Sequence, residues 1–214
     1  MTVADITPIP GLTLRPERPE EYRETEEVTR EAFYNRYAPG TTTHYVLHLL
    51  RKDPAFEPWH SIVAEYDGAV IGHILLSPAF IRRESGEDVP VLTIGPVTVL
   101  PAAALRGVGS ALMREAMARA REHGAPAVVL TGNPAYYRRF GFVSASRFGI
   151  RYPGVPADRE AAFFMAYPLE DGALDGCGGL YEASPLFEAD GPECDAFDAT
   201  FPPRRKLKLP GQLV

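Results

Sequence analysis

The chain has 214 residues, of which 45% are hydrophobic and 23% are charged. These fractions match ordinary globular proteins and exclude a disordered or fibrous chain. No apolar run reaches the roughly 18–20 residues that cross a bilayer, and the first eleven residues lack the basic start of a signal peptide. The net charge of −6 argues against nucleic acid as a partner. We therefore expect a cytoplasmic protein that binds neither membrane nor nucleic acid.

The first half of the sequence predicts helices followed by an antiparallel meander. Alternating, β-branched residues mark strands, and apolar residues spaced three or four apart mark helices. Asp67-Gly68 is a strong two-residue hairpin signal between two of the strands. In chain order we expect a strand over Leu12–Arg15, helices over Glu20–Tyr34 and His44–Arg51, and strands over His60–Tyr66, Ala69–Ile81 and Val89–Leu100.

Beyond the meander the pattern changes to helix and then strand. The segment Gly107–His123 carries one apolar stripe, which predicts an amphipathic helix. The apolar run Ala127–Leu130 is typical of a buried parallel strand, so the order predicts a βαβ unit. The fold class is therefore α/β or α+β with a mixed sheet. We also expect a short helix over Pro134–Arg139 and strands near Phe142–Ser146 and Ala161–Leu169.

The last part of the chain differs in composition from the rest. We divide the chain into a domain over residues 1–169 and an acidic extension over residues 170–214. No Lys or Arg occurs in residues 160–203, while Asp and Glu accumulate there. Aromatic side chains such as Phe187 and Phe201 favour docking of the extension on the domain over a fully solvated tail.

Cysteines and paired histidines give weak signals. Cys177 and Cys194 are the two cysteines of the chain, and we expect free thiols. His44 and His48 have the i, i+4 spacing of a zinc-protease motif, but Tyr45 stands where that motif has its glutamate. We therefore expect no metal site.

Two glycine-containing segments flank the predicted βαβ helix. Gly95-Pro96 interrupts a strand-like run, which predicts a bulge or a sheet edge because proline has no N–H to donate. Gly107 and Gly109 precede the helix, where free backbone N–H groups can bind a phosphate. The same turn also fits a plain strand-to-helix connection. A dinucleotide fingerprint is excluded because Leu112 replaces its third glycine, and a P-loop is excluded because Gly-Lys-Ser/Thr is missing.

A third segment completes a recognisable combination. The three segments are Gly-Pro-Val-Thr-Val-Leu-Pro at 95–101, Arg-Gly-Val-Gly-Ser at 106–110 and Tyr-Tyr-Arg-Arg-Phe-Gly-Phe at 136–142. In this order they resemble the GCN5-related N-acetyltransferase (GNAT) superfamily, in particular its bacterial YhbS-like branch. The resemblance covers about residues 12–180, and we expect it to include the acidic extension too. It implies a mixed, mostly antiparallel central sheet with helices on both faces, splayed at the βαβ unit into a cofactor cleft.

The resemblance implies acetyl-CoA as co-substrate, with its pyrophosphate at the start of the βαβ helix and its pantetheine arm in the cleft. The N–H of Val99 or a neighbour would polarise the thioester carbonyl. The cofactor-binding residues implied are Val97, Thr98, Val99, Leu105, Arg106, Gly107, Val108, Gly109, Ser110 and Asn133.

Tyr137 matches the tyrosine that is proposed in the family to protonate the departing thiolate. A phenol has a reference pKa of about 10, so it holds a proton to give at neutral pH. The alternative is that Tyr136 and Tyr137 form only a packed aromatic pair. Tyr136 itself we interpret as a core residue.

The sequence departs from the family pattern at two positions. Ala104 stands where relatives carry a long polar side chain, and Arg106 is the residue that would contact phosphate instead. Thr93 stands where some relatives carry a glutamate base. A water chain to Glu65 or His73 is the remaining hypothesis for the base, although His73 fits a hydrogen-bonded core residue better.

The function expected is direct attack of an amine, from a small molecule or a protein, on the bound thioester. The alternatives are transfer of a different acyl group and a non-catalytic acyl-CoA sensor. We expect Phe33, Tyr34 and Tyr37 to line the acceptor pocket. The acidic extension is either a solvated face or a cover over that pocket. A homodimer is possible, because members of the family often form dimers.

Overall fold

Nine strands form one mixed sheet in the computed structural model, which describes residues 9–84 and 86–212. The strands are β1 (Leu12–Pro16), β2 (Ser61–Tyr66), β3 (Ala69–Arg82), β4 (Val89–Val99), β5 (Ala127–Thr131), β6 (Val143–Ser144), β7 (Ile150–Arg151), β8 (Phe164–Pro168) and β9 (Gly179–Ala183). The α-helices are α1 (Tyr22–Phe33), α2 (Thr43–Leu50), α3 (Val108–Glu122), α4 (Pro134–Tyr137) and α5 (Pro192–Asp198). Short 3-10 turns are η1 (Pro19–Glu21), η2 (Pro58–His60), η3 (Pro101–Ala103), η4 (Arg138–Phe140), η5 (Ala145–Phe148) and η6 (Pro185–Glu188).

The main path of the sheet runs β1-β2-β3-β4-β5-β8-β6. Strands β1 to β4 are antiparallel neighbours, so they form the predicted meander. Strands β4 and β5 are parallel and α3 crosses between them, which is the predicted βαβ unit. Strand β8 then pairs antiparallel with both β5 and β6. The prediction of a mixed, mostly antiparallel sheet is confirmed.

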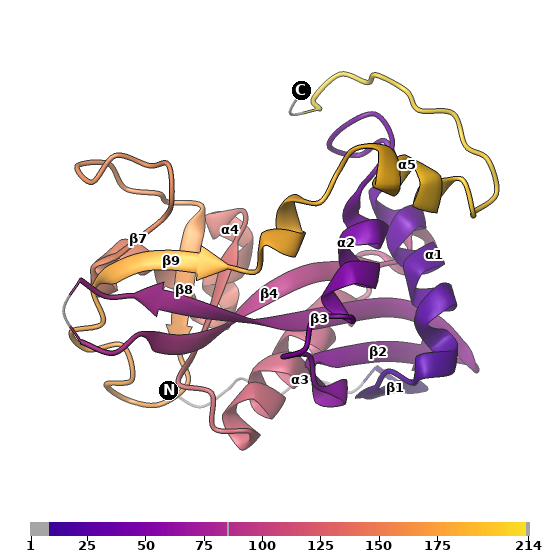
Figure 1. The fold of residues 1–214 in the computed structure, drawn as a ribbon. Helices are drawn as coiled ribbons and strands as arrows, with labels where there is room; N and C mark the ends of the chain where they lie inside the picture. Colours follow the sequence, from indigo (N-terminus) through magenta and orange to yellow (C-terminus); the bar gives the residue numbers. More distant parts are fainter. Residues whose placement is uncertain (1–8, 85, 213–214) are drawn as a thin grey trace.

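Helices cover both faces of the sheet, as predicted. Figure 1 shows α1 and α2 on one face and α3 on the other. The apolar stripe of α3 is fully buried at Leu112 and Ala116, where it packs on Ile62 and Ile74 of the sheet. Burying one leucine side chain contributes roughly 1.5–3 kcal/mol. This packing fixes the first turn of α3 beside β4, where the site described below is built.

Three predicted elements are shorter in the structure. The strand expected over Phe142–Ser146 is reduced to β6, because the chain turns into η5 directly afterwards. The helix expected over Pro134–Arg139 is one α-helical turn followed by η4, which ends at Gly141 with a φ of 91°. The strand expected over Ala161–Leu169 begins at Phe164.

The segment after residue 169 adds a strand that the sequence analysis did not predict. This strand, β9, pairs antiparallel with the far end of β3 and parallel with β7, which was not predicted either. After β9 the chain crosses to α2, which contacts both η6 and α5, and its last residues run past α1 (Figure 1). The side chain of Arg30 on α1 holds this part, with Nε 2.7 Å from Asp198 Oδ1 and Nη1 3.1 Å from Pro202 O. Cys177 and Cys194 are buried free thiols.

A buried polar cluster joins α2 to the sheet. The side chains of Arg51 and Glu17 are 2% and 0% exposed, and Arg51 Nη2 lies 2.6 Å from Glu17 Oε1. Ser61 Oγ donates to Glu17 Oε2 at 2.5 Å and lies 2.7 Å from His73 Nε2. The prediction that His73 is a hydrogen-bonded core residue is therefore confirmed.

The two paired histidines of α2 have separate surroundings. His44 is fully buried between the rings of Phe197 and Phe201, at centroid distances of 5.4 and 5.0 Å, and its Nε2 lies 3.1 Å from Asp198 Oδ1. His48 Nδ1 instead lies 2.9 Å from a carboxylate oxygen of α1. Within residues 9–84 and 86–212 no group of three or more His, Cys, Asp and Glu could hold a metal ion.

Burial makes His44 sensitive to pH. Desolvation lowers the pKa of His44 to about 4, although the neighbouring Asp198 favours the charged form. The folded state keeps the ring neutral, whereas the unfolded chain binds a proton below pH about 6.5. The stability that the protein gains by burying a neutral His44 ring is therefore fully present above pH 6.5, and it is lost as the pH falls toward 4.

We predict that His44→Gln flattens the pH dependence of stability between pH 7 and 5. His44 alone should account for about 2 kcal/mol of the wild-type loss over this interval. Urea unfolding at pH 7 and at pH 5 measures this loss in the free energy of unfolding. His123→Gln, which changes an exposed histidine, is the control and should keep the wild-type loss. An unchanged loss in His44→Gln would contradict the assignment.

Candidate functional site

Strands β4 and β5 separate after a short parallel contact. They pair at two positions, Leu92 with Val128 and Thr93 with Val129. From Ile94 to the end of β4, the edge of β4 that faces β5 is not paired with any described strand. The backbone N–H and C=O groups along this edge therefore remain available to an extended ligand.

The predicted bulge lies where the two strands part. Ile74 of β3 opposes Val97, whereas Leu76 opposes Ile94, so Leu75 alone faces the pair Gly95-Pro96. Two residues opposite one define a β-bulge, and a bulge bends the strand that carries it. The bend turns the second half of β4 away from β5, so the bulge prediction is confirmed.

The residues expected along the pantetheine arm follow the bulge. Thr98 is buried and its Oγ1 lies 3.2 Å from Thr29 Oγ1 on α1. Val97 and Val99 pack on the opposite face, against the core beneath α3. Their side chains point to the two faces of the sheet, so β4 presents backbone groups to the cleft.

The first turn of α3 provides free N–H groups at the mouth of the cleft. Gly107 is its N-cap, with a φ of 87°, and no side chain caps the helix. The first N–H bonded within the helix belongs to Ala111, which donates to Gly107 O at 3.0 Å. The N–H groups of Val108, Gly109 and Ser110 thus point out of the helix end, where anions bind.

The loop before α3 is open to solvent. Leu105 has a φ of 63°, which is uncommon for a leucine, and its side chain is fully exposed. Arg106 is also exposed. Of the residues expected to bind pyrophosphate, Leu105, Arg106 and Gly107 are exposed, whereas Gly109 and Ser110 are half-buried and the side chain of Val108 is buried.

The segment after β5 approaches the cleft from the opposite side. A Cβ atom added at Gly109 would lie 3.5 Å from both Tyr136 Oη and Val99 Cγ2, so α4, α3 and β4 meet at this glycine. Tyr136 is half-buried, and its hydroxyl is directed to the start of α3 instead of into the core. Asn133 is exposed and caps α4, its Oδ1 accepting from Ala135 N at 3.0 Å.

The ring of Tyr137 packs on Gly132, a residue that the sequence analysis missed. A Cβ atom at Gly132 would lie 2.4 Å from Tyr137 Cε2. The rings of Tyr136 and Tyr137 meet edge to face, with centroids 4.9 Å apart. A glycine directly after the last strand residue is typical of a close approach, but the sequence does not indicate which side chain makes that approach.

The phenol of Tyr137 holds its proton firmly. Burial raises the pKa of Tyr137 to about 12, and the nearby phenols of Tyr136 and Tyr37 add to the effect. A phenol with this pKa stays protonated throughout the neutral range, as a general acid has to be.

Neither hypothesis for the base fits the structure. Glu65 lies on β2, two strands from β4, and its Oε2 is 2.5 Å from Arg15 Nη2. His73 is fully buried, burial lowers its pKa, and its Nε2 is occupied by Ser61. Thr93 Oγ1 accepts a hydrogen bond from the hydroxyl of Tyr181 at 2.8 Å.

Two cavities lie on the α1 and α2 side of the molecule. One, of about 220 Å³, is lined by Phe33 and Tyr37 together with Cys194 and other residues of α5. The third aromatic residue expected at the acceptor pocket, Tyr34, instead donates from its hydroxyl to Arg204 O at 3.0 Å.

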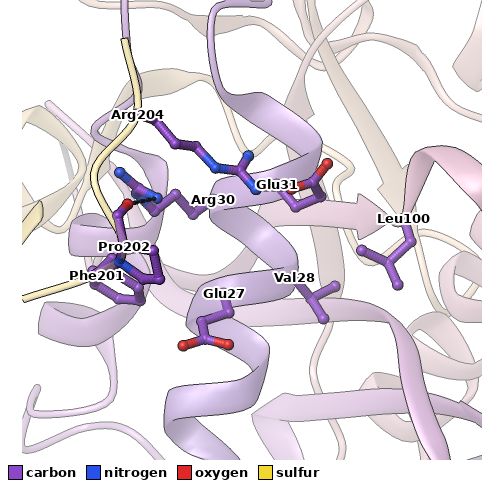
Figure 2. Close-up of a pocket in the computed structure, with 8 residues that line it drawn as sticks. All are labelled: Glu27, Val28, Arg30, Glu31, Leu100, Phe201, Pro202 and Arg204. Atoms are coloured by element: carbon purple, nitrogen blue, oxygen red, sulfur yellow. Dashed lines mark hydrogen bonds and ion pairs between the residues drawn. The ribbon is translucent and has the colours of Figure 1, made fainter. Parts of the chain in front are cut away.

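The other cavity, of about 280 Å³, is lined by residues of α1, by Leu100 and by residues of the terminal segment. Figure 2 shows it between Leu100 and the terminal segment, which Arg30 holds through Pro202 O. Its lining includes the ion pair of Glu31 and Arg204. None of the residues predicted to bind acetyl-CoA lines it.

Comparison with known proteins agrees with this geometry. A family described as "Acetyltransferase (GNAT) domain" matches residues 13–145. The N-acetyltransferase YhbS of Escherichia coli K12 is 34% identical over 139 residues, covering 64% of this chain and 78% of that protein. Its crystal structure in complex with CoA has a TM-score of 0.72 at 29% identity, covering 87% of this chain and 97% of that chain.

A second solved structure is a GNAT family acetyltransferase from Brucella melitensis in complex with acetyl-CoA. It has a TM-score of 0.64 at 33% identity and covers 82% of this chain and 97% of that chain. The chain belongs to the GCN5-related N-acetyltransferase superfamily and is an N-acetyltransferase. Within the superfamily it is YhbS-like, as the sequence motifs predicted. No helix in the described part of the chain is long and apolar enough to cross a membrane.

The contact between Gly132 and Tyr137 gives a prediction about stability. Gly132→Ala should lower the free energy of unfolding by about 1–3 kcal/mol, because the new methyl group overlaps the Tyr137 ring. In the background Tyr137→Ala, the same change should cost little, so the two substitutions should couple. Urea unfolding of the single and double variants measures the coupling. Additive effects would show that the ring does not lie against Gly132.

Proposed function

We propose that this enzyme transfers an acetyl group from acetyl-CoA to a primary amine. The observation that carries the proposal is the free edge of β4 leading to the uncapped first turn of α3. An extended amide-containing arm fits the first feature and a pyrophosphate fits the second. The crystallised relatives in complex with CoA and acetyl-CoA support the same ligand.

The residues of the chain fit the proposed ligand in specific ways. The N–H groups of Val108, Gly109 and Ser110 would bind pyrophosphate oxygens, and the exposed Arg106 adds a positive charge beside them. Gly109 permits close approach because it carries no side chain. The backbone of β4 from Val97 to Val99 would bind the amides of the pantetheine arm and polarise the thioester carbonyl.

The proposed reaction is a direct transfer. The amine nitrogen forms a bond to the acetyl carbon, the bond from that carbon to sulfur breaks, and the sulfur leaves as a thiolate. Tyr137 supplies the proton that the thiolate takes up, and solvent returns a proton to the phenolate. The amine releases its own proton to water, since Glu65 and His73, the two residues considered as the base, are bonded to Arg15 and Ser61. Positioning, carbonyl polarisation and proton supply are therefore the contributions of the protein.

Thermal unfolding tests the ligand. At a concentration 100 times its dissociation constant, acetyl-CoA should stabilise the protein by roughly 2.7 kcal/mol. For a chain of this size the midpoint should rise by about 5–10 °C. CoA should act similarly and ATP should not. No shift with either CoA species would refute the proposed function, and binding without turnover on any amine would favour a sensor.

The role of Tyr137 predicts a distinctive pH profile. Tyr137→Phe should lower kcat by about 100-fold or more and leave acetyl-CoA binding unchanged, because only proton transfer is lost. Because the pKa of Tyr137 is raised to about 12, wild-type activity should rise with pH as the amine loses its proton and should not fall at pH 10. Tyr136→Phe is the matched control. A wild-type decline centred near pH 10, or unchanged turnover in Tyr137→Phe, would exclude this role.

A further inference from the structure

The segment that follows β9 lies over the bulge of β4. Phe187, in η6, packs with the buried cluster of Val46, Leu47, Leu50 and Leu75. The same ring reaches the bulge, since a Cβ atom added at Gly95 would lie 3.7 Å from Phe187 Cε1. A ring from the acidic extension therefore stands on the face of β4 where Gly95 leaves space.

The direction of the cleft brings the acyl end of the proposed ligand close to Phe187. Under the proposed function, the pantetheine arm runs along β4 from Val99 toward the bulge, and the acyl group lies at its inner end. The cleft closes one step beyond, because Thr93 is already paired with Val129 of β5. An acyl chain longer than acetyl cannot continue along the strand edge and has to turn out of the sheet.

The opposite face of β4 is covered by the core beneath α3, so the acyl chain has to turn toward the face at Gly95. There a growing chain meets Leu75, whose carbonyl oxygen and Cδ2 are 3.2 and 3.4 Å from a Cβ position on Gly95, and beside it the ring of Phe187. The neighbouring position on this face, Thr93, is covered by Tyr181, whose hydroxyl donates to it. Aromatic side chains of the extension thus cover both positions of β4 at the closed end of the cleft.

We propose that Phe187 limits the length of the acyl group and makes the enzyme selective for acetyl-CoA over longer acyl-CoA species. This inference rests on the proposed function and adds the residue that sets its acyl specificity. In a fitted apolar pocket one methylene group changes discrimination by roughly 10–200-fold. Removing the ring would open space beside Gly95 for the two further methylene groups of a butyryl chain.

Docking of the extension is a separate role that Phe187 shares with a neighbour. Leu186 packs on the same cluster of Val46, Leu47, Leu50 and Leu75, but the three atoms nearest to a Cβ position on Gly95 belong to Leu75 and Phe187. Leu186→Ala therefore weakens the docking of η6 without opening the bulge. It is the matched control for Phe187→Ala.

Binding of CoA, acetyl-CoA, propionyl-CoA and butyryl-CoA to the full chain, measured by isothermal titration calorimetry, tests the proposal without knowledge of the acceptor. Wild type and Leu186→Ala should bind acetyl-CoA at least about tenfold more tightly than butyryl-CoA. In Phe187→Ala the two dissociation constants should come within about threefold, with the affinity for CoA unchanged. In Phe187→Leu the ratio of the two dissociation constants should lie between those of the wild type and Phe187→Ala. This variant replaces Phe187→Ala if the alanine variant does not fold.

Three results would overturn the proposal. In the first, the wild type binds butyryl-CoA as tightly as acetyl-CoA. In the second, the ratio of the butyryl-CoA and acetyl-CoA dissociation constants is the same in both Phe187 variants as in the wild type. In the third, Leu186→Ala changes this ratio as much as Phe187→Ala does. In each of these cases CoA still binds, so the proposed function stands. Failure of the wild type to bind any of the four ligands would instead remove the proposed function and this inference with it.

Discussion

The parting of β4 and β5 is the constraint on which the site depends. Backbone polar groups inside a sheet are normally paired, and leaving a strand edge unpaired is unfavourable unless another partner takes it. Here the bulge at Gly95-Pro96 bends β4 after Thr93 and creates such an edge. The first turn of α3 extends this set of free donors, because no side chain caps it. A ligand with amides along its length and a pyrophosphate at its end satisfies both.

The segment after residue 169 is integrated into the architecture that surrounds this edge. Strand β9 extends the sheet beside β3, η6 lies over the bulge, and α5 packs on α2. Asp198 forms an ion pair with Arg30 and lies against the neutral ring of His44, so polar groups from α1, α2 and α5 meet in one place. Buried charges persist only when they are paired, and this grouping ties the three helices together.

Local signals in the sequence were sufficient to predict the elements that shape the cleft. Proline has no N–H, so Gly95-Pro96 indicated the bulge, and Gly107 indicated the start of α3. Long-range placement was not predictable in the same way. Strand β9 was missed because it pairs with residues of β3 about a hundred positions earlier in the chain. Glu65 was considered as a base because nothing in its local sequence indicates the ion pair with Arg15.

Contacts in which an aromatic ring packs on a glycine could not be predicted from sequence patterns either. Gly132 and Gly95 each permit an aromatic ring to approach, from Tyr137 and Phe187 respectively. A pattern of residue types shows a glycine and an aromatic residue, but their meeting depends on the path of the backbone between them. This is why Tyr137 could be named as a functional residue while Gly132, against which it rests, could not.

The ion pair between Arg30 and Asp198 has a consequence for synthesis on the ribosome. These residues are 168 positions apart, so α1 emerges long before the carboxylate that neutralises its buried guanidinium. Contacts of such wide sequence separation form late, and the waiting surface is exposed to wrong partners in the meantime. The part of α1 that this late segment covers carries a charged residue, Arg30. A nascent chain with this composition remains hydrated until its last segment arrives.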